Sequence, residues 1–142
     1  MRVITANLNG VRSAATKGFF DWAARRRADF VCVQELKAQD KDMTPAFRSI
    51  GRLNGAFAYA LKKGYSGVGC YTHLTPDRVQ IGLGAGFDDI DSEGRWSQVD
   101  IGNLTVVSVY FPSGSSGDER QAFKYRFMDR VLPVFDNLMA SG

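Results

Sequence analysis

Histidine and cysteine are scarce in this sequence, with one histidine and two cysteines among 142 residues. Cys32 and Cys70 each lie in an apolar, strand-like run without metal-ligand spacing, so we expect two reduced core residues in a cytoplasmic protein. His73 stands alone at the end of a predicted strand, and we assign it no role. These absences leave no support for a cysteine metal site or a disulfide framework.

Long apolar runs and two common catalytic motifs are also missing. No stretch is long enough to span a membrane, and the start, MRVITANLNG, lacks the apolar core and cleavage site of a secretory signal. There is no Gly-x-Ser-x-Gly elbow to supply a serine nucleophile and no glycine-rich phosphate loop. We therefore expect neither serine-based acyl transfer nor P-loop chemistry, and no membrane partner.

The composition is that of a globular protein, with 44% hydrophobic and 23% charged residues. The length suits one domain with a real core and is too short for two ordinary ones. A net charge of +3 leans weakly toward a polyanionic partner. The densest basic cluster, Arg25-Arg26-Arg27, is expected on a solvated helix face, with nucleic-acid contact as the less favoured alternative.

The apolar pattern predicts alternating strands and helices, followed by several consecutive strands. We predict strands at residues 2–6 and 30–33 and helices at residues 19–28 and 44–52. Further strands are predicted at residues 56–61, 67–72, 78–83, 95–101 and 104–111. A final helix begins near Glu119, and Pro133 is expected to bend or interrupt it. This order indicates an α/β (α+β) protein, a mixed sheet with helical cover.

Polar side chains of three chemical types stand at the ends of apolar strands: Asn7, Glu35 and Tyr110. Glu35 either marks where a strand surfaces or is held rigidly by the core as a ligand. A carboxylate suits Mg²⁺, an amide can hydrogen-bond a phosphate oxygen or a water, and a phenol can donate to a phosphate oxygen. Together these groups favour phosphodiester cleavage.

Five segments match a known family in order and approximate spacing: TANLNGVRS, VCVQELKAQ, GYSGVGCYT, SEGRW and VYFPSGSS. They resemble the exonuclease III family, the bacterial apurinic/apyrimidinic endonucleases of the endonuclease/exonuclease/phosphatase superfamily, over residues 2–139. The resemblance implies the N-terminal part of a four-layer α/β/β/α sandwich with mixed, largely antiparallel sheets (DNase I-like).

The same resemblance implies a cytoplasmic DNA-repair nuclease. Such an enzyme carries out Mg²⁺-dependent phosphodiester hydrolysis 5′ to abasic sites, with 3′–5′ exonuclease and 3′-end trimming activity, and Mn²⁺ can substitute for Mg²⁺. Its partner would be double-stranded DNA with abasic sites or blocked 3′ ends. No obligate protein partner is expected.

The resemblance also implies a role for each matching residue. Glu35 would bind the catalytic Mg²⁺, Asn7 would lie beside that metal and the attacking water, and Tyr110 would lie against the phosphate. Lys37 and Asn9 would support the site, and because some relatives carry an aspartate in place of Asn9, a second metal is less expected here. DNA contacts are expected from Arg12, Lys17, Tyr65, Arg95 and Ser113.

Without the resemblance, Tyr65 and Arg95 would be interpreted as ordinary surface residues of hairpins. The family's domain is longer and includes a Gly-Asp-x-Asn strand end and an Asp-His pair, neither of which occurs in this sequence. We therefore expect residues 1–142 to form a single incomplete domain, the N-terminal portion of a longer protein or an incomplete gene product, without nuclease activity of its own. The alternatives are a non-catalytic half-domain and a superfamily phosphodiesterase that acts on another phosphate ester.

Overall fold

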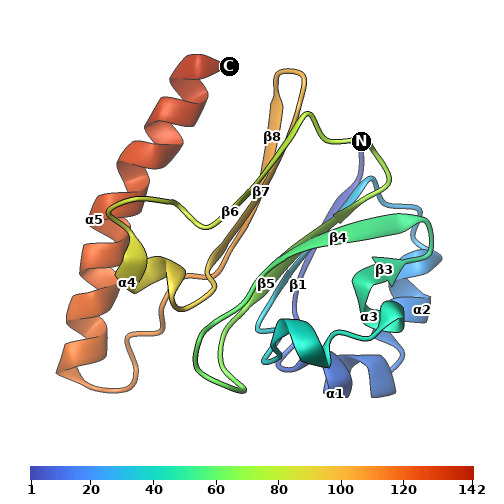
Figure 1. Cartoon of the computed structure of the whole chain (residues 1–142), viewed down its shortest axis with the longest axis horizontal. Helices are drawn as coiled ribbons and strands as arrows, with labels where there is room; N and C mark the ends of the chain where they lie inside the picture. Colours follow the sequence, from blue (N-terminus) through green and yellow to red (C-terminus); the bar gives the residue numbers. More distant parts are fainter.

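The computed structural model describes residues 1–142, which form two β-sheets with helices on both outer faces (Figure 1). The first sheet has the strand order β1-β2-β5-β4-β3, and the second has the order β6-β7-β8. The strands are β1 (Val3–Asn7), β2 (Phe30–Gln34), β3 (Ser49–Ile50), β4 (Leu53–Ala58), β5 (Val68–Thr72), β6 (Arg78–Ile81), β7 (Trp96–Ile101) and β8 (Leu104–Val109). Only β1 and β2 pair in parallel, so both sheets are largely antiparallel.

The helices complete the layers. Three helices and a 3₁₀ turn lie beside the first sheet, and two helices lie beside the second (Figure 1). In chain order these elements are α1 (Val11–Thr16), α2 (Phe19–Ala24), η1 (Asp40–Asp42), α3 (Pro45–Arg48), α4 (Asp88–Asp91) and α5 (Asp118–Ser141). The helix-sheet-sheet-helix order confirms the predicted α/β/β/α architecture. None of the helices combines the length and apolar character that crossing a membrane requires.

Strand β2 is buried on both faces, which explains its continuous apolar run. Val31 and Val33 face the helices in one cluster, whereas Phe30 and Cys32 face the second sheet in another. All four residues are at most 5% exposed. A third cluster, which includes Trp96 and the helix face of α5, fills the space on the other side of the second sheet. The strand that carries Glu35 at its end is therefore anchored from both sides.

Several predicted boundaries differ from the structure. Helix α1 was not predicted, because it begins after Gly10 without a side-chain cap and so lacks a start signal. The helix predicted at residues 44–52 ends at Arg48, where the chain becomes strand β3. The short helix α4 lies between the strands predicted at residues 78–83 and 95–101, where no helix is predicted. Strand β4 begins at Leu53 because Gly51 adopts φ 56° and turns the chain from β3 into β4.

Pro133 does not interrupt the final helix, which continues unbroken to Ser141. The proline is on the exposed side of α5, where a freed carbonyl can bond to water. Phe127 and Val131, on the opposite side, are each 1% exposed and pack in the cluster with Trp96. Packing on the sheet side therefore holds the helix together across the proline.

Candidate active site

The three polar residues predicted at strand ends converge in the structure. Asn7 is the last residue of β1, Glu35 follows β2 directly, and Tyr110 follows β8 directly. Because β1 and β2 are parallel, with Asn7 opposite Gln34, their carboxyl ends meet at one edge of the sheet. Tyr110 comes from the second sheet, so the site lies where the two sheets come together.

The carboxylate of Glu35 is the centre of this cluster. Its Oε1 accepts a hydrogen bond of 2.6 Å from Oη of Tyr110 and one of 3.0 Å from Nδ2 of Asn7. Its Oε2 lies 3.5 Å from Nζ of Lys37. The Tyr110 hydrogen bond, with help from Asn7 and Lys37, holds the pKa of Glu35 below its usual value. Glu35 is therefore a fixed, ionised carboxylate at neutral pH.

Tyr110 keeps its proton in this arrangement. Burial, followed by the Glu35 hydrogen bond and charge, raises the pKa of Tyr110 to about 12. The neutral phenol can therefore donate to an oxygen at any physiological pH, but it is not available as a base.

Asn9 and Lys37 form the next contacts around Glu35. The Asn9 backbone N–H donates to Oδ1 of Asn7 at 3.0 Å, which fixes the amide orientation of Asn7. Nζ of Lys37 donates to Oδ1 of Asn9 at 2.6 Å and stands beside the free oxygen of Glu35. Asn9, Glu35 and Lys37 all have left-handed backbones, with φ of 47°, 53° and 50°. Such conformations are maintained only where surrounding contacts hold them, and they are frequent at functional sites.

Backbone hydrogen bonds provide that support. The N–H groups of Gly10 and Val11 donate to the carbonyls of Glu35 and Leu36, at 2.8 and 2.9 Å. The N–H of Leu36 donates in turn to the carbonyl of Gly67 at 3.0 Å. Gly67 has φ 89°, and a Cβ there would lie 3.1 Å from Cβ of Leu36. The loops after β1, β2 and β4 are thus joined into one rigid rim.

A second network surrounds the predicted DNA-contact residues Tyr65 and Arg95. The phenol oxygen of Tyr65 accepts hydrogen bonds from Nη2 of Arg95 at 2.9 Å and from Nη2 of Arg120 at 3.1 Å. Glu93 Oε1 accepts from the same two arginines, at 3.0 and 3.2 Å. Arg95 also donates to the backbone carbonyl of Tyr110 at 3.0 Å and lies over its ring. Through Arg95, this network therefore holds both the backbone and the ring of Tyr110 in place.

The structure places Arg95 in the interior, because its side chain is only 1% exposed. In this arrangement the guanidinium contacts protein groups, and its contact with DNA stays a prediction. Glu93 and Arg120 were not predicted as site residues. Glu93 lies in the SEGRW motif quoted above, but nothing in the sequence pairs it with a residue on α5.

The remaining predicted DNA-contact residues, Arg12, Lys17 and Ser113, all lie on the surface. The Arg12 side chain is 62% exposed and forms an ion pair of 3.0 Å with Asp42. Lys17 follows α1 and is exposed. Ser113 is exposed in the loop before α5, where its Oγ shares a hydrogen bond of 2.7 Å with Ser115. No contact joins Lys17 or Ser113 to Glu35 itself, so their roles stay predictions.

The donor groups fit a lightly held Mg²⁺ ion. Oε2 of Glu35 is a hard oxygen ligand that neither Tyr110 nor Asn7 occupies. No group of three or more acidic, histidine or cysteine side chains is assembled anywhere in the chain. One carboxylate with water and phosphate oxygens is a common way to hold Mg²⁺. Glu35 would thus be one protein ligand of the metal, and water and phosphate oxygens would fill the other coordination positions.

Comparison with known proteins defines the class of this fold and site. Residues 4–134 match the endonuclease/exonuclease/phosphatase family, and the chain belongs to that family. It is 32% identical over 135 residues to an exodeoxyribonuclease of Bacillus subtilis, covering 93% of this chain and 51% of that protein. It is 27% identical over 130 residues to a DNA-(apurinic or apyrimidinic site) endonuclease of Dictyostelium discoideum, covering 91% and 35%.

The fold has a solved counterpart in the APE2 catalytic domain of Xenopus laevis, with a TM-score of 0.86 and 24% identity. The match covers 100% of this chain and 55% of that one. The chain therefore spans about half the length of the solved domain and of the Bacillus relative, and a smaller share of the Dictyostelium protein. The exonuclease III resemblance and the DNase I-like fold are both confirmed.

Proposed function

We propose that this chain forms part of a DNA-repair nuclease that hydrolyses phosphodiester bonds 5′ to abasic sites and trims 3′ ends. The observation that carries the proposal is the ionised Glu35 carboxylate, held by Tyr110 and Asn7 at the edge where the two sheets meet. The names of the two relatives, an exodeoxyribonuclease and a DNA-(apurinic or apyrimidinic site) endonuclease, suggest the substrate class.

Each residue of the cluster has a chemical task in this proposal. Glu35 holds Mg²⁺ through Oε2, while Asn7 and Tyr110 fix the carboxylate in position. When bound, the metal supplies Lewis-acid stabilisation of the charge that develops on the phosphate, and Mn²⁺ can take its place. The Tyr110 phenol, which stays protonated, is a donor that can turn from Glu35 to a phosphate oxygen. Lys37 adds a positive charge next to Asn9, where a phosphate can approach.

Double-stranded DNA is the proposed partner. Arg12, Lys17 and Ser113 contact its phosphates, and Tyr65 packs against the damaged duplex with Arg95 fixing its orientation. Extruding an abasic sugar from the duplex costs little free energy, because no base has to be unstacked. The two buried thiols, Cys32 and Cys70, face each other across β2 and β5 and are both free, which supports a cytoplasmic location. No obligate protein partner is part of this proposal.

The 142-residue chain by itself is expected to be inactive. The side chains that contact the Glu35 carboxylate are Asn7, Tyr110 and Lys37, and none of them is an acid or a histidine that could activate water. Catalytic groups that act as a unit contribute non-additively to the rate. A site that has only one of these groups should therefore retain little of the full activity. A nicking assay on an abasic duplex in Mg²⁺, run beside the Bacillus exodeoxyribonuclease, checks this. Cleavage by the chain at a comparable rate would overturn the expectation.

The metal and DNA assignments can be tested in the isolated chain without turnover. Mn²⁺ should selectively broaden the amide signals of Glu35 and Leu36, and Glu35→Gln should abolish the broadening. Glu119→Gln, on the exposed start of α5, is the matched control and should leave it unchanged. Fluorescence anisotropy should show tighter binding of an abasic duplex than of a phosphoinositide vesicle. Broadening that survives Glu35→Gln, or a preference for the vesicle, would contradict the proposal.

A further inference from the structure

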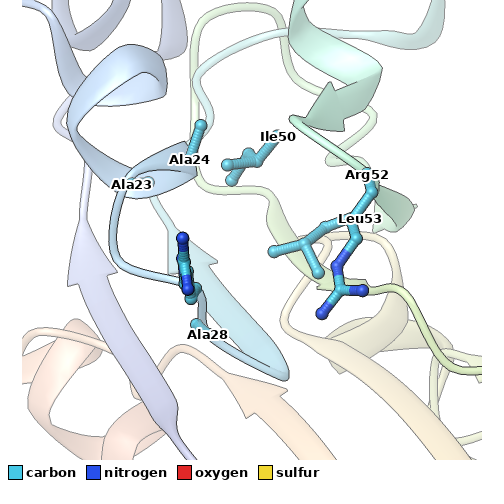
Figure 2. Close-up of a pocket in the computed structure, with 7 residues that line it drawn as sticks. Ala23, Ala24, Ala28, Ile50, Arg52 and Leu53 are labelled. Atoms are coloured by element: carbon cyan, nitrogen blue, oxygen red, sulfur yellow. The ribbon is translucent and has the colours of Figure 1, made fainter.

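A cleft of about 440 Å³ lies at the other end of the first sheet from the candidate active site (Figure 2). Ala28 lines it two residues before β2 begins, whereas Glu35 follows the end of the same strand. The lining residues come from α2 and the chain after it, and from β3, the turn that follows it and the start of β4: Ala23, Ala24, Arg27, Ala28, Ile50, Arg52 and Leu53. This volume falls within the range typical of small-molecule sites.

The floor of the cleft is apolar and well fixed. Ala23, Ala28, Ile50 and Leu53 are at most 4% exposed. In Figure 2 the side chains of Ile50 and Leu53 extend into the space opposite the helix that carries Ala23. Gly51 lies against Ala24, because a Cβ on it would lie 3.5 Å from Cβ of Ala24. Three of the seven lining residues are alanines.

The rim of the cleft is positively charged. Arg27 and Arg52 are exposed, and neither belongs to any of the ion pairs in the structure. Arg25 and Arg26 stand beside Arg27 and are likewise without a carboxylate partner. The acidic residue that follows them, Asp29, is engaged by the Arg2 backbone N–H at 2.8 Å and by His73 at 3.0 Å. The guanidinium groups at the rim thus lack an anion.

We propose that this cleft binds a mononucleotide unit, with its base on the apolar floor and its phosphate between Arg27 and Arg52. The apolar floor can bury the face of a base. Guanidinium groups bind phosphate through paired hydrogen bonds and also stack on aromatic rings. The unit can be a free mononucleotide or the terminal nucleotide of a single strand. Since the cleft shares no residue with the candidate active site, the proposal stands independently of the nuclease assignment.

The test is a titration of the ¹⁵N-labelled 142-residue chain with four probes: deoxyadenosine monophosphate, deoxyadenosine, inorganic phosphate and a 5′-phosphorylated oligothymidine. The monophosphate should shift the signals of Ala24, Ala28 and Leu53, and should bind at least about tenfold more tightly than deoxyadenosine or phosphate alone. Tighter binding of the oligonucleotide at the same signals would identify a strand end as the source. Weaker binding would identify the free mononucleotide.

Variants separate this site from general charge attraction. Arg27→Glu and Arg52→Glu should each weaken monophosphate binding about tenfold, and Ala24→Trp should block it by filling the cleft. Arg78→Glu is the control, since Arg78 is an exposed arginine on β6 outside the cleft. An unchanged ¹H–¹⁵N spectrum elsewhere shows that each variant is folded. No binding at millimolar monophosphate, equal binding of inorganic phosphate, or equal weakening by Arg78→Glu would each overturn the proposal.

Discussion

The phenol of Tyr110 donates a 2.6 Å hydrogen bond to the carboxylate of Glu35, joining residues 75 positions apart and the two sheets of the fold. Each residue changes the chemistry of the other. The phenol lowers the pKa of the carboxyl group, and the carboxylate adds to burial in raising the pKa of the phenol to about 12. The pair is therefore a charged acceptor and a neutral donor over the whole physiological pH range.

Tyr110→Phe should destabilise the fold by about 1.5 kcal/mol at pH 7, since it removes a hydrogen bond to a charged group that is partly exposed. The folded-state pKa of Glu35 is lowered, so the stabilisation is fully present above its ordinary value of 4.5 and is lost as pH falls through the folded-state pKa. The difference between variant and wild type should therefore shrink in acid. Urea unfolding at pH 7 and pH 3 measures it, with the exposed Tyr125→Phe as control. A difference that does not change with pH would contradict the assignment.

Burial is the largest cause of the raised pKa of Tyr110, which is about 12, and Glu35 is the next; Glu35→Gln should therefore lower this pKa only in part, because a neutral amide no longer opposes the phenolate. Absorbance of tyrosinate near 295 nm follows the titration. Part of the shift comes from burial and should persist in the variant. If the titration curves of the variant and the wild type coincide, the charge of Glu35 does not act on Tyr110.

Arg95→Met should destabilise the fold by about 3 kcal/mol, since it leaves Glu93 without its buried partner and removes a donor to the Tyr110 carbonyl. Arg120→Met should cost less, about 1 kcal/mol, because that side chain is 30% exposed and water can replace it. Chemical denaturation of both variants provides the measurement. Equal costs would show that burial does not distinguish the two arginines.

Arg12→Ala and Lys17→Ala should each reduce the slope of log K against log salt for duplex binding by about one, as expected for the loss of one phosphate contact. Arg12 has to leave Asp42 to make that contact, so its effect on affinity should be the smaller. Anisotropy titrations between low and moderate salt give the slopes. Lys124→Ala on α5 is the control, and an unchanged slope for Arg12→Ala and Lys17→Ala would remove their assignment.

The parts of the site that sequence could predict are those fixed by local pattern. Asn7, Glu35 and Tyr110 each stand at the end of an apolar run. A strand that is buried on both faces, such as β2, is continuously apolar and can therefore be recognised in the sequence. The burial of Arg95 could not be predicted in this way, because a lone arginine in a hairpin is ordinarily exposed. It is buried here because Glu93 and Tyr65 satisfy its guanidinium, and one of these partners lies 30 positions away.

The partnership of Tyr65 with Arg120 spans 55 positions and depends on how α5 packs against the second sheet. The hydrophobic periodicity of the sequence does not predict a contact between two residues so far apart in the chain. The overall layers were predictable because hydrophobic period and family motifs agree. The short elements α1, β3 and α4 were not, since each is fixed by backbone turns and tertiary packing rather than by its own propensity.

Lys37→Met should tighten Mn²⁺ binding in the absence of DNA, by about fivefold. The ammonium lies 3.5 Å from Oε2 of Glu35, so it repels a divalent ion that approaches the same oxygen. It also donates to Asn9 at 2.6 Å, and the loop should keep its shape in the variant because its backbone hydrogen bonds do not involve the lysine side chain. Titration of Mn²⁺ followed by electron paramagnetic resonance gives the affinity, with Lys124→Met as control. Weaker binding in Lys37→Met would instead make the lysine a supporting residue that orients Glu35 for the metal, and the repulsion argument would be wrong.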